Sequence, residues 1–156
     1  MSNEVTNYNP GQATLLEMRA DSTRFPRIKT MTDEDAVFQL SRIVTQAFLY
    51  RGQAADPTNI QFISSALIQE IRQDRTFGLS DLSLAEIQVV VKRAVLGGSE
   101  MFGISVASLY KVIMEYVKGE GHRNQEVVNN RKREETQVSP IIKAYTGEFM
   151  RNHKNR

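Results

Sequence analysis

Apolar residues recur at intervals of three and four through the middle of the chain, which is the spacing of one face of an α-helix. A residue type that caps helix N-termini precedes each stripe: Thr32, Asp56 (followed by proline), Ser83 and Ser105. Four helices are therefore predicted. Their stripes are Val37, Leu40, Val44, Ala47 and Phe48; Ile60, Ile63, Leu67 and Ile71; Leu84, Ile87, Val91, Ala94 and Val95; and Val106, Leu109, Ile113, Tyr116 and Val117.

Glycines mark where these helices are expected to end. Gly52, the pair Gly97-Gly98, and Gly119 with Gly121 each follow a stripe, and glycine enters the left-handed conformation without strain. The run 75–81 breaks the helical period and predicts a loop. No segment alternates in the manner of a β-strand. The pattern predicts an all-α fold, a compact bundle of about four helices.

Polar residues gather at the two ends of the chain, which divides it into three parts. Residues 1–30 are rich in Asn, Gly, Ser and Thr and are expected to form a flexible N-terminal arm, which either lies over the core or extends freely from it. The helical domain is predicted over 31–119. Residues 120–156 are expected to form a basic C-terminal arm that ends in a short amphipathic helix after Ser139-Pro140. The apolar stripe of that helix is Ile141, Ile142, Tyr145 and Phe149.

The chain carries few of the residue types that catalysis or metal binding needs. It has no cysteine, and its two histidines, His122 and His153, lie in the polar C-terminal arm. The glycines at 97, 98 and 103 are not followed by the Gly-Lys-Ser or Gly-Lys-Thr of a phosphate loop. We therefore expect no enzyme activity, no cofactor and no metal, and a protein that binds a macromolecule.

The ends of the sequence and its charge bear on location and partners. No apolar run approaches the roughly 20 residues that span a bilayer, and residues 1–11 lack the features of a secretory signal. A cytoplasmic protein with no membrane contact is expected. The net charge is +2, but 118–156 holds nine basic and five acidic side chains. This excess, with the triplet Arg131, Lys132 and Arg133, favours binding to DNA or to an acidic face of a protein, and a solvated arm is the alternative.

The segment 83–118 is similar to a helix-turn-helix, in which a small polar cap precedes a helix that reads base edges. In that hypothesis Ser105, Ser108 and Lys111 face outward, with Lys92 and Arg93 near the DNA backbone. The linker 97–104 is about twice as long as the usual three or four residues. Two helices that simply pack in the core are the alternative. The apolar loop residues Met101 and Phe102 are expected either to enter the core or to dock a partner.

A second resemblance covers more of the chain. The order of segments 59–67 (NIQFISSAL), 82–87 (LSLAEI) and 103–113 (GISVASLYKVI) resembles that of small replication-associated proteins of phages and mobile elements of gut bacteria. These proteins are helicase-loader-like or replisome-organiser-like, and the similarity spans roughly 56–117. The tryptophan that such proteins often carry in their last helix is absent here.

The resemblance implies a non-catalytic adaptor in DNA replication. Because the chain has no ATP site of the Walker type, it would be an ATP-independent adaptor that contacts a hexameric replicative helicase and single-stranded DNA. A helix-turn-helix DNA-binding regulator and a purely protein-binding or structural subunit are the alternatives. A homo-oligomer is compatible with each of the three. Binding to DNA that weakens with salt would separate the first two from the third.

Overall fold

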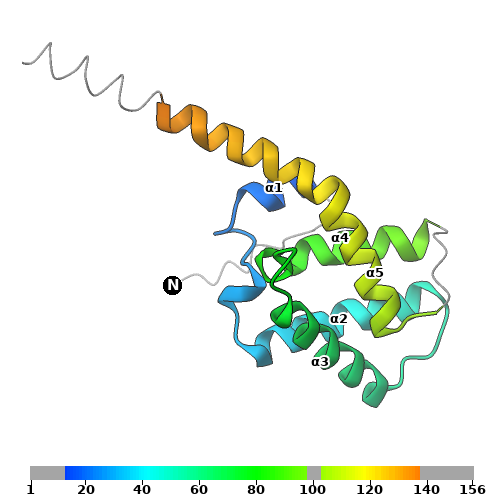
Figure 1. The fold of residues 1–156 in the computed structure, drawn as a ribbon. Coiled ribbons are helices and arrows are strands. Elements are labelled where there is room, and N and C mark those ends of the chain that lie inside the picture. The colour runs from blue at the N-terminus through cyan, green and yellow to red at the C-terminus, as the bar shows by residue number, and fades with distance from the viewer. Residues whose placement is uncertain (1–12, 98–102, 138–156) are drawn as a thin grey trace, which may run out of the picture.

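The computed structural model describes residues 13–97 and 103–137, and all of the regular structure in these ranges is helical (Figure 1). The all-α prediction is confirmed. The longest helix begins as α5, passes through a π-helical turn, η3, and continues over 122–137 as one helix of 32 residues. The elements are α1 (Leu15–Ala20), η1 (Ile28–Thr30), α2 (Asp33–Tyr50), α3 (Pro57–Gln73), η2 (Leu79–Asp81), α4 (Leu84–Leu96), α5 (Val106–Tyr116) and η3 (Val117–Gly121).

The starts of the four predicted helices are confirmed by their caps. Thr32 Oγ1 accepts a hydrogen bond from the backbone N–H of residue 35 at 3.2 Å, and Asp56 Oδ1 accepts one from residue 58 at 3.2 Å. Ser83 and Ser105 each begin a reciprocal capping box. Each side chain satisfies backbone N–H groups that have no partner inside the helix, so local sequence determines where these helices begin.

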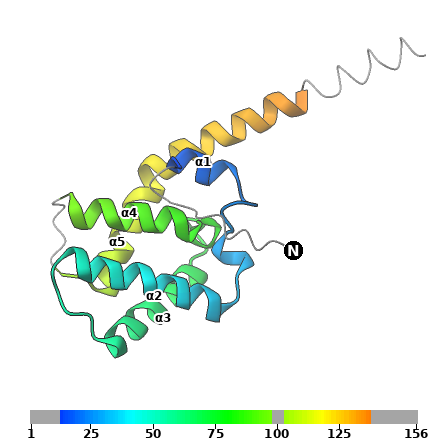
Figure 2. The same ribbon diagram turned by 180° about the vertical axis from the view of Figure 1, so that it is seen from behind.

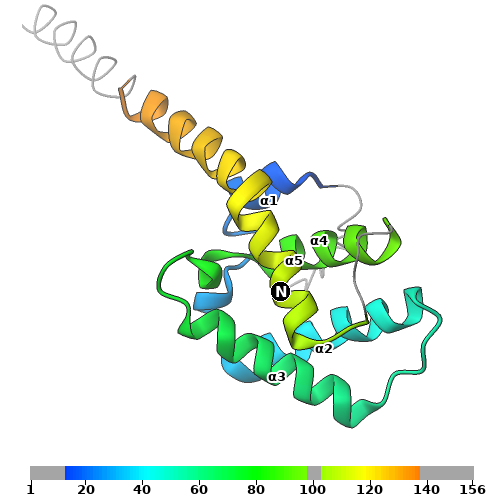
Figure 3. The same cartoon turned by 45° about the vertical axis from the view of Figure 1, so that its right-hand side comes forward.

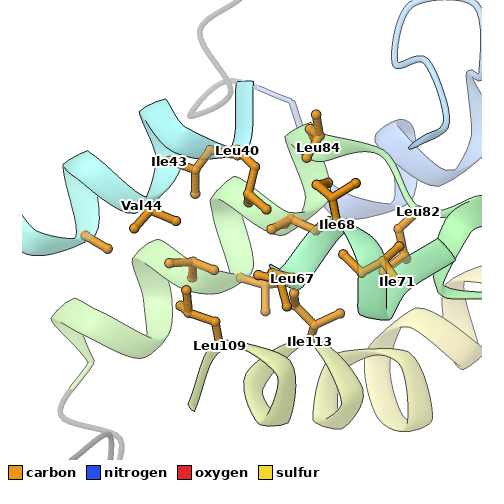
Figure 4. Packing of buried hydrophobic residues seen from close by; sticks show 14 of the residues in the cluster. Leu40, Ile43, Val44, Leu67, Ile68, Ile71, Leu82, Leu84, Leu109 and Ile113 are labelled. Atoms are coloured by element: carbon orange, nitrogen blue, oxygen red, sulfur yellow. The ribbon is translucent and has the colours of Figure 1, made fainter. Parts of the chain in front are cut away.

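The helices pack around one core. The helices α2 and α3 lie against each other, α4 lies alongside α2, and α5 packs on α3 and α4 (Figures 1 and 3). The close view in Figure 4 shows side chains from all four helices meeting in this core. The predicted core residues all belong to a single buried cluster: Leu40, Val44, Ile63, Leu67, Leu84, Ile87, Val91, Leu109 and Ile113.

The described part of the expected N-terminal arm, residues 13–30, packs onto the domain. The Ile28 N–H donates to the Leu82 carbonyl at 2.9 Å, which fixes the segment beside the start of α4. Its apolar residues are too widely spaced to form a long stripe, so the sequence pattern did not show that they are buried. Four of them enter the core cluster: Leu15, Met18, Phe25 and Ile28.

The prediction that Gly119 and Gly121 end the fourth helix is wrong. Neither glycine has a positive φ, and the helix passes through both of them. Glycine permits a left-handed residue but does not require one. By contrast Gly52, with φ of 67°, ends α2 as expected, whereas Gly97 follows α4 with φ of −82°, which is not left-handed.

Beyond η3 the long helix leaves the body of the protein. In the opposite views of Figures 1 and 2, α1 lies beside the first part of 122–137 and the remainder projects outward. Val128 is the buried residue of this stretch, and every residue from 129 to 137 is exposed. We call 129–137 the projecting helix.

We predict that Leu109→Ala lowers the free energy of unfolding by about 2 to 5 kcal/mol, because it leaves a cavity in the core. Leu109 is 1% exposed, while Leu96, which is 56% exposed, supplies a matched control. Leu96→Ala should change stability by less than about 0.5 kcal/mol. Urea denaturation measures both, and equal effects would contradict the packing described here.

Gly119 and Gly121, which both lie in η3, should respond differently to substitution by alanine. A Cβ added at Gly119 meets nothing within 4 Å, so Gly119→Ala should stabilise the helix by about 0.5 to 1 kcal/mol. A Cβ at Gly121 would lie 3.0 Å from the Tyr116 carbonyl oxygen and 3.2 Å from its ring. Gly121→Ala should therefore show no such gain in urea denaturation. A Gly121→Ala protein as stable as Gly119→Ala would show that this close approach does not matter.

Candidate functional site

A fully buried carboxylate lies at the centre of the most polar part of the interior. Glu86, in the first turn of α4, is 0% exposed. Its Oε2 accepts hydrogen bonds from Ser83 N at 2.8 Å and Ser83 Oγ at 3.0 Å, and its Oε1 accepts one from Tyr116 Oη at 2.9 Å. The capping box of α4 is thereby extended to a residue at the end of α5.

Two arginines from the N-terminal segment complete this cluster. Arg19 Nε lies 3.4 Å from Glu86 Oε1, and an Arg27 Nη lies 3.8 Å from Glu86 Oε2. Arg27 also donates to the backbone carbonyls of Met18 at 2.9 Å and Arg19 at 2.6 Å, and Arg19 donates to the carbonyl of Asp81. Residues 19–27 are thus tied by charge to Glu86 in α4 and to Asp81 in η2.

Burial and neighbouring charges shift the pKa values of Tyr116 and Arg27 in this cluster. Burial, and then the negative charge and hydrogen bond of Glu86, raise the pKa of Tyr116 well above its ordinary value. Burial lowers the pKa of Arg27, the nearby charge of Arg19 acts in the same direction, and Glu86 opposes both. Because the carboxylate is enclosed and both of its oxygens have donors, we interpret the cluster as structural. Within 13–97 and 103–137, no group of three or more His, Asp or Glu residues could hold a metal ion.

The side chains of the five residues proposed for a helix-turn-helix reader differ in their partners. Ser105 N donates to Ser108 Oγ at 2.9 Å and Ser108 N to Ser105 Oγ at 3.1 Å, so both hydroxyls serve the capping box. Lys92 Nζ lies 5.8 Å from the centre of the Tyr50 ring, on the side of α2.

Arg93, the next residue on α4, points instead toward the long helix, where its Nη1 pairs with Glu120 Oε2 at 3.1 Å. Lys111 is exposed on α5. The structure thus directs Lys92 and Arg93 to different neighbours, whereas Ser105 and Ser108 are bonded to each other.

The basic triplet of the C-terminal arm lies on the projecting helix. Arg131, Lys132 and Arg133 are all exposed. Glu134 and Glu135 follow them directly, so the positive charge of the projecting helix lies on three successive residues. The remaining candidates, which were chosen for docking a partner, lie outside the described residues: Met101, Phe102, Ile141, Ile142, Tyr145 and Phe149.

One pairing on the surface was not predicted. Phe77, in the loop before η2, is 42% exposed, and Lys118 Nζ lies 5.0 Å from the centre of its ring. The sequence showed only that 75–81 breaks the helical period. Lys118 of η3 reaches this ring because of the way α5 crosses α3. A local sequence pattern does not predict how two helices cross.

Comparisons with protein-family models, curated proteins and solved structures found no match to this chain. Function is therefore inferred from the residues and their geometry. Among the helices that the structure describes, none has both the length and the apolar character needed to cross a bilayer.

We predict that Glu86→Gln lowers the free energy of unfolding by about 3 to 5 kcal/mol, since it removes the buried counter-charge shared by Arg19 and Arg27. The half-exposed carboxylate of Asp81, 3.8 Å from Arg19, replaces it only in part. Glu70→Gln on the exposed side of α3 is the matched control and should have little effect. Thermal or urea denaturation measures both. If the two variants are equally stable, the buried ion pairs do not hold the N-terminal segment in place.

Proposed function

We propose that the protein is a non-catalytic adaptor in DNA replication, which binds a replicative helicase, DNA or both through its C-terminal region. The observation that carries the proposal is the projecting helix. Nine successive residues, 129–137, are exposed, and they include the triplet Arg131, Lys132 and Arg133. The compact domain serves in this proposal as the base from which the helix extends.

The form of this helix supports a role in reaching a partner. A helix that is polar all round has little stability of its own, because helical stability in proteins comes mainly from packing of an apolar face. The projecting helix continues a helix that is already packed on the domain, so the unfavourable step of forming a first helical turn is not needed. At 1.5 Å per residue, nine residues extend the chain by roughly 14 Å. Residues 138–156 follow this helix in the sequence and carry further basic residues and the predicted apolar stripe.

The part of the proposal that names replication is supported by the resemblance of segments 59–67, 82–87 and 103–113 to replication-associated proteins. The geometry favours an adaptor over a helix-turn-helix regulator. Arg93 is paired with Glu120, and the hydroxyls of Ser105 and Ser108 are used in a cap. Little is left on the first turns of α5 with which to read base edges.

Neutralising the triplet tests the proposal. We expect Arg131→Gln/Lys132→Gln/Arg133→Gln to weaken binding to single-stranded DNA and to reduce the slope of log K against log salt by up to about 2, since each phosphate contact contributes about 0.7. Fluorescence anisotropy at several salt concentrations measures this slope. Stability should change by less than about 0.5 kcal/mol, because the three side chains are exposed.

A charge change of opposite sign on the same helix is the control. Glu134→Gln/Glu135→Gln should strengthen the same binding. Capture of the purified replicative helicase from the organism that encodes the protein gives a second measurement. A triple variant that binds DNA and helicase as well as the parent would overturn the role of this helix. Helicase capture without any DNA binding would support the purely protein-binding alternative.

A further inference from the structure

We infer that Phe77 and Lys118 form a stacking site for a base of a single-stranded polynucleotide, separate from the basic triplet. The inference rests on the proposed function, because it identifies where the adaptor would contact nucleic acid on its folded domain. Proteins that bind single strands combine exposed aromatic rings, on which bases stack, with cations that follow the phosphates. The loop between α3 and η2 supplies the ring, and η3 supplies a cation beside it.

The loop holds Phe77 in a fixed position. The Asp74 carboxylate accepts hydrogen bonds from the backbone N–H groups of residues 76, 77 and 79, at 3.1 to 3.3 Å. Burial acts to raise the pKa of Asp74, but these backbone donors outweigh it and lower the pKa. Gly78 adopts φ of 66°, a left-handed conformation that suits glycine, and Leu79 is fully buried. A ring on such a loop is ordered before a ligand arrives.

The core does not need the Phe77 ring. Its neighbour Leu79 is 0% exposed, whereas Phe77 keeps 42% of its surface in contact with solvent. Lys118 is exposed, and its Nζ lies 5.0 Å from the ring centre. A lysine has a flexible four-carbon stem. A base that stacks on Phe77 would therefore displace the ammonium group toward the phosphate beside that base.

Further cations lie near Phe77 and Lys118 in the sequence, and the carboxylate of Asp74 in the same loop is engaged by backbone N–H groups. Arg75 is exposed two residues before Phe77, and Lys111 is exposed seven residues, about two helical turns, before Lys118. Glu115 is the acidic side chain between the two lysines. An acidic peptide would pair with the cations but leave the ring exposed, and duplex DNA keeps the faces of its bases stacked inside. A single strand can stack a base on the ring and place its phosphates beside the cations.

The absence of tryptophan from the chain gives a direct test. Phe77→Trp places one tryptophan at the proposed site, and its fluorescence should be quenched by an oligonucleotide of about 20 thymidines. An abasic oligomer of the same length carries the phosphates without the bases and should not quench it. An oligouridine of the same length shows whether RNA is bound as well as DNA, and stacking of either polymer supports the site.

Affinity gives the second readout. Phe77→Ala should weaken binding to oligothymidine roughly 5- to 150-fold, the range expected for loss of one stacked base. Phe62→Ala on α3 is the matched control, since Phe62 is 66% exposed and its loss should leave affinity unchanged. Lys118→Gln should reduce the salt dependence by about one phosphate contact. The Phe77→Ala and Phe62→Ala proteins should be equally stable.

Three results would overturn the site: equal affinities of the Phe77→Ala and Phe62→Ala proteins, unchanged emission from Phe77→Trp, or no binding of the parent to either polymer. The adaptor proposal has a separate readout. Phe77→Ala should still capture the helicase, while neutralising Arg131, Lys132 and Arg133 should leave quenching of Phe77→Trp intact at saturating oligonucleotide. Each of the two proposals can therefore fail while the other stands.

Discussion

The fold depends on the desolvated carboxylate of Glu86. A buried charge of this kind costs several kcal/mol unless it is paired and hydrogen-bonded. Here the partners come from three parts of the chain: Arg19 and Arg27 from the N-terminal segment, Ser83 from the cap of α4, and Tyr116 from the end of α5. None of these parts can leave without removing a partner of the carboxylate. The N-terminal segment, the middle of the domain and the long helix therefore form one unit.

Local signals predicted the helices well, and contacts between distant residues explain what was missed. Thr32, Asp56, Ser83 and Ser105 act within their own turn, so the sequence shows where helices begin. The path of the chain through Gly119 was not predictable in the same way, because glycine allows both a helix and its end. The packing of 13–30 includes ion pairs between Glu86 and two arginines far from it in the sequence, which no local pattern contains.

In the candidate site, too, local features could be predicted from the sequence and contacts between distant residues could not. Composition alone indicated the basic triplet, and the structure places all three residues on an exposed helix. Lys92 and Arg93 are neighbours in sequence, yet one lies over Tyr50 and the other pairs with Glu120. The Phe77 ring and Lys118 meet only because the long helix passes the loop that holds Asp74 and Leu79. Adjacency in sequence was thus a poor guide to which cations share a surface.

The π-helical turn of η3 has a geometric effect on everything that follows it. Such a turn holds one residue more than an α-helical turn, and each residue of an α-helix advances the chain by about 100° around the axis. The turn over Val117–Gly121 therefore shifts every later side chain by about that angle, while changing the length of the helix by only about 1.5 Å. How far the projecting helix reaches is fixed by the number of its residues. The direction in which Arg131, Lys132 and Arg133 face is fixed by this one turn, next to the body of the protein.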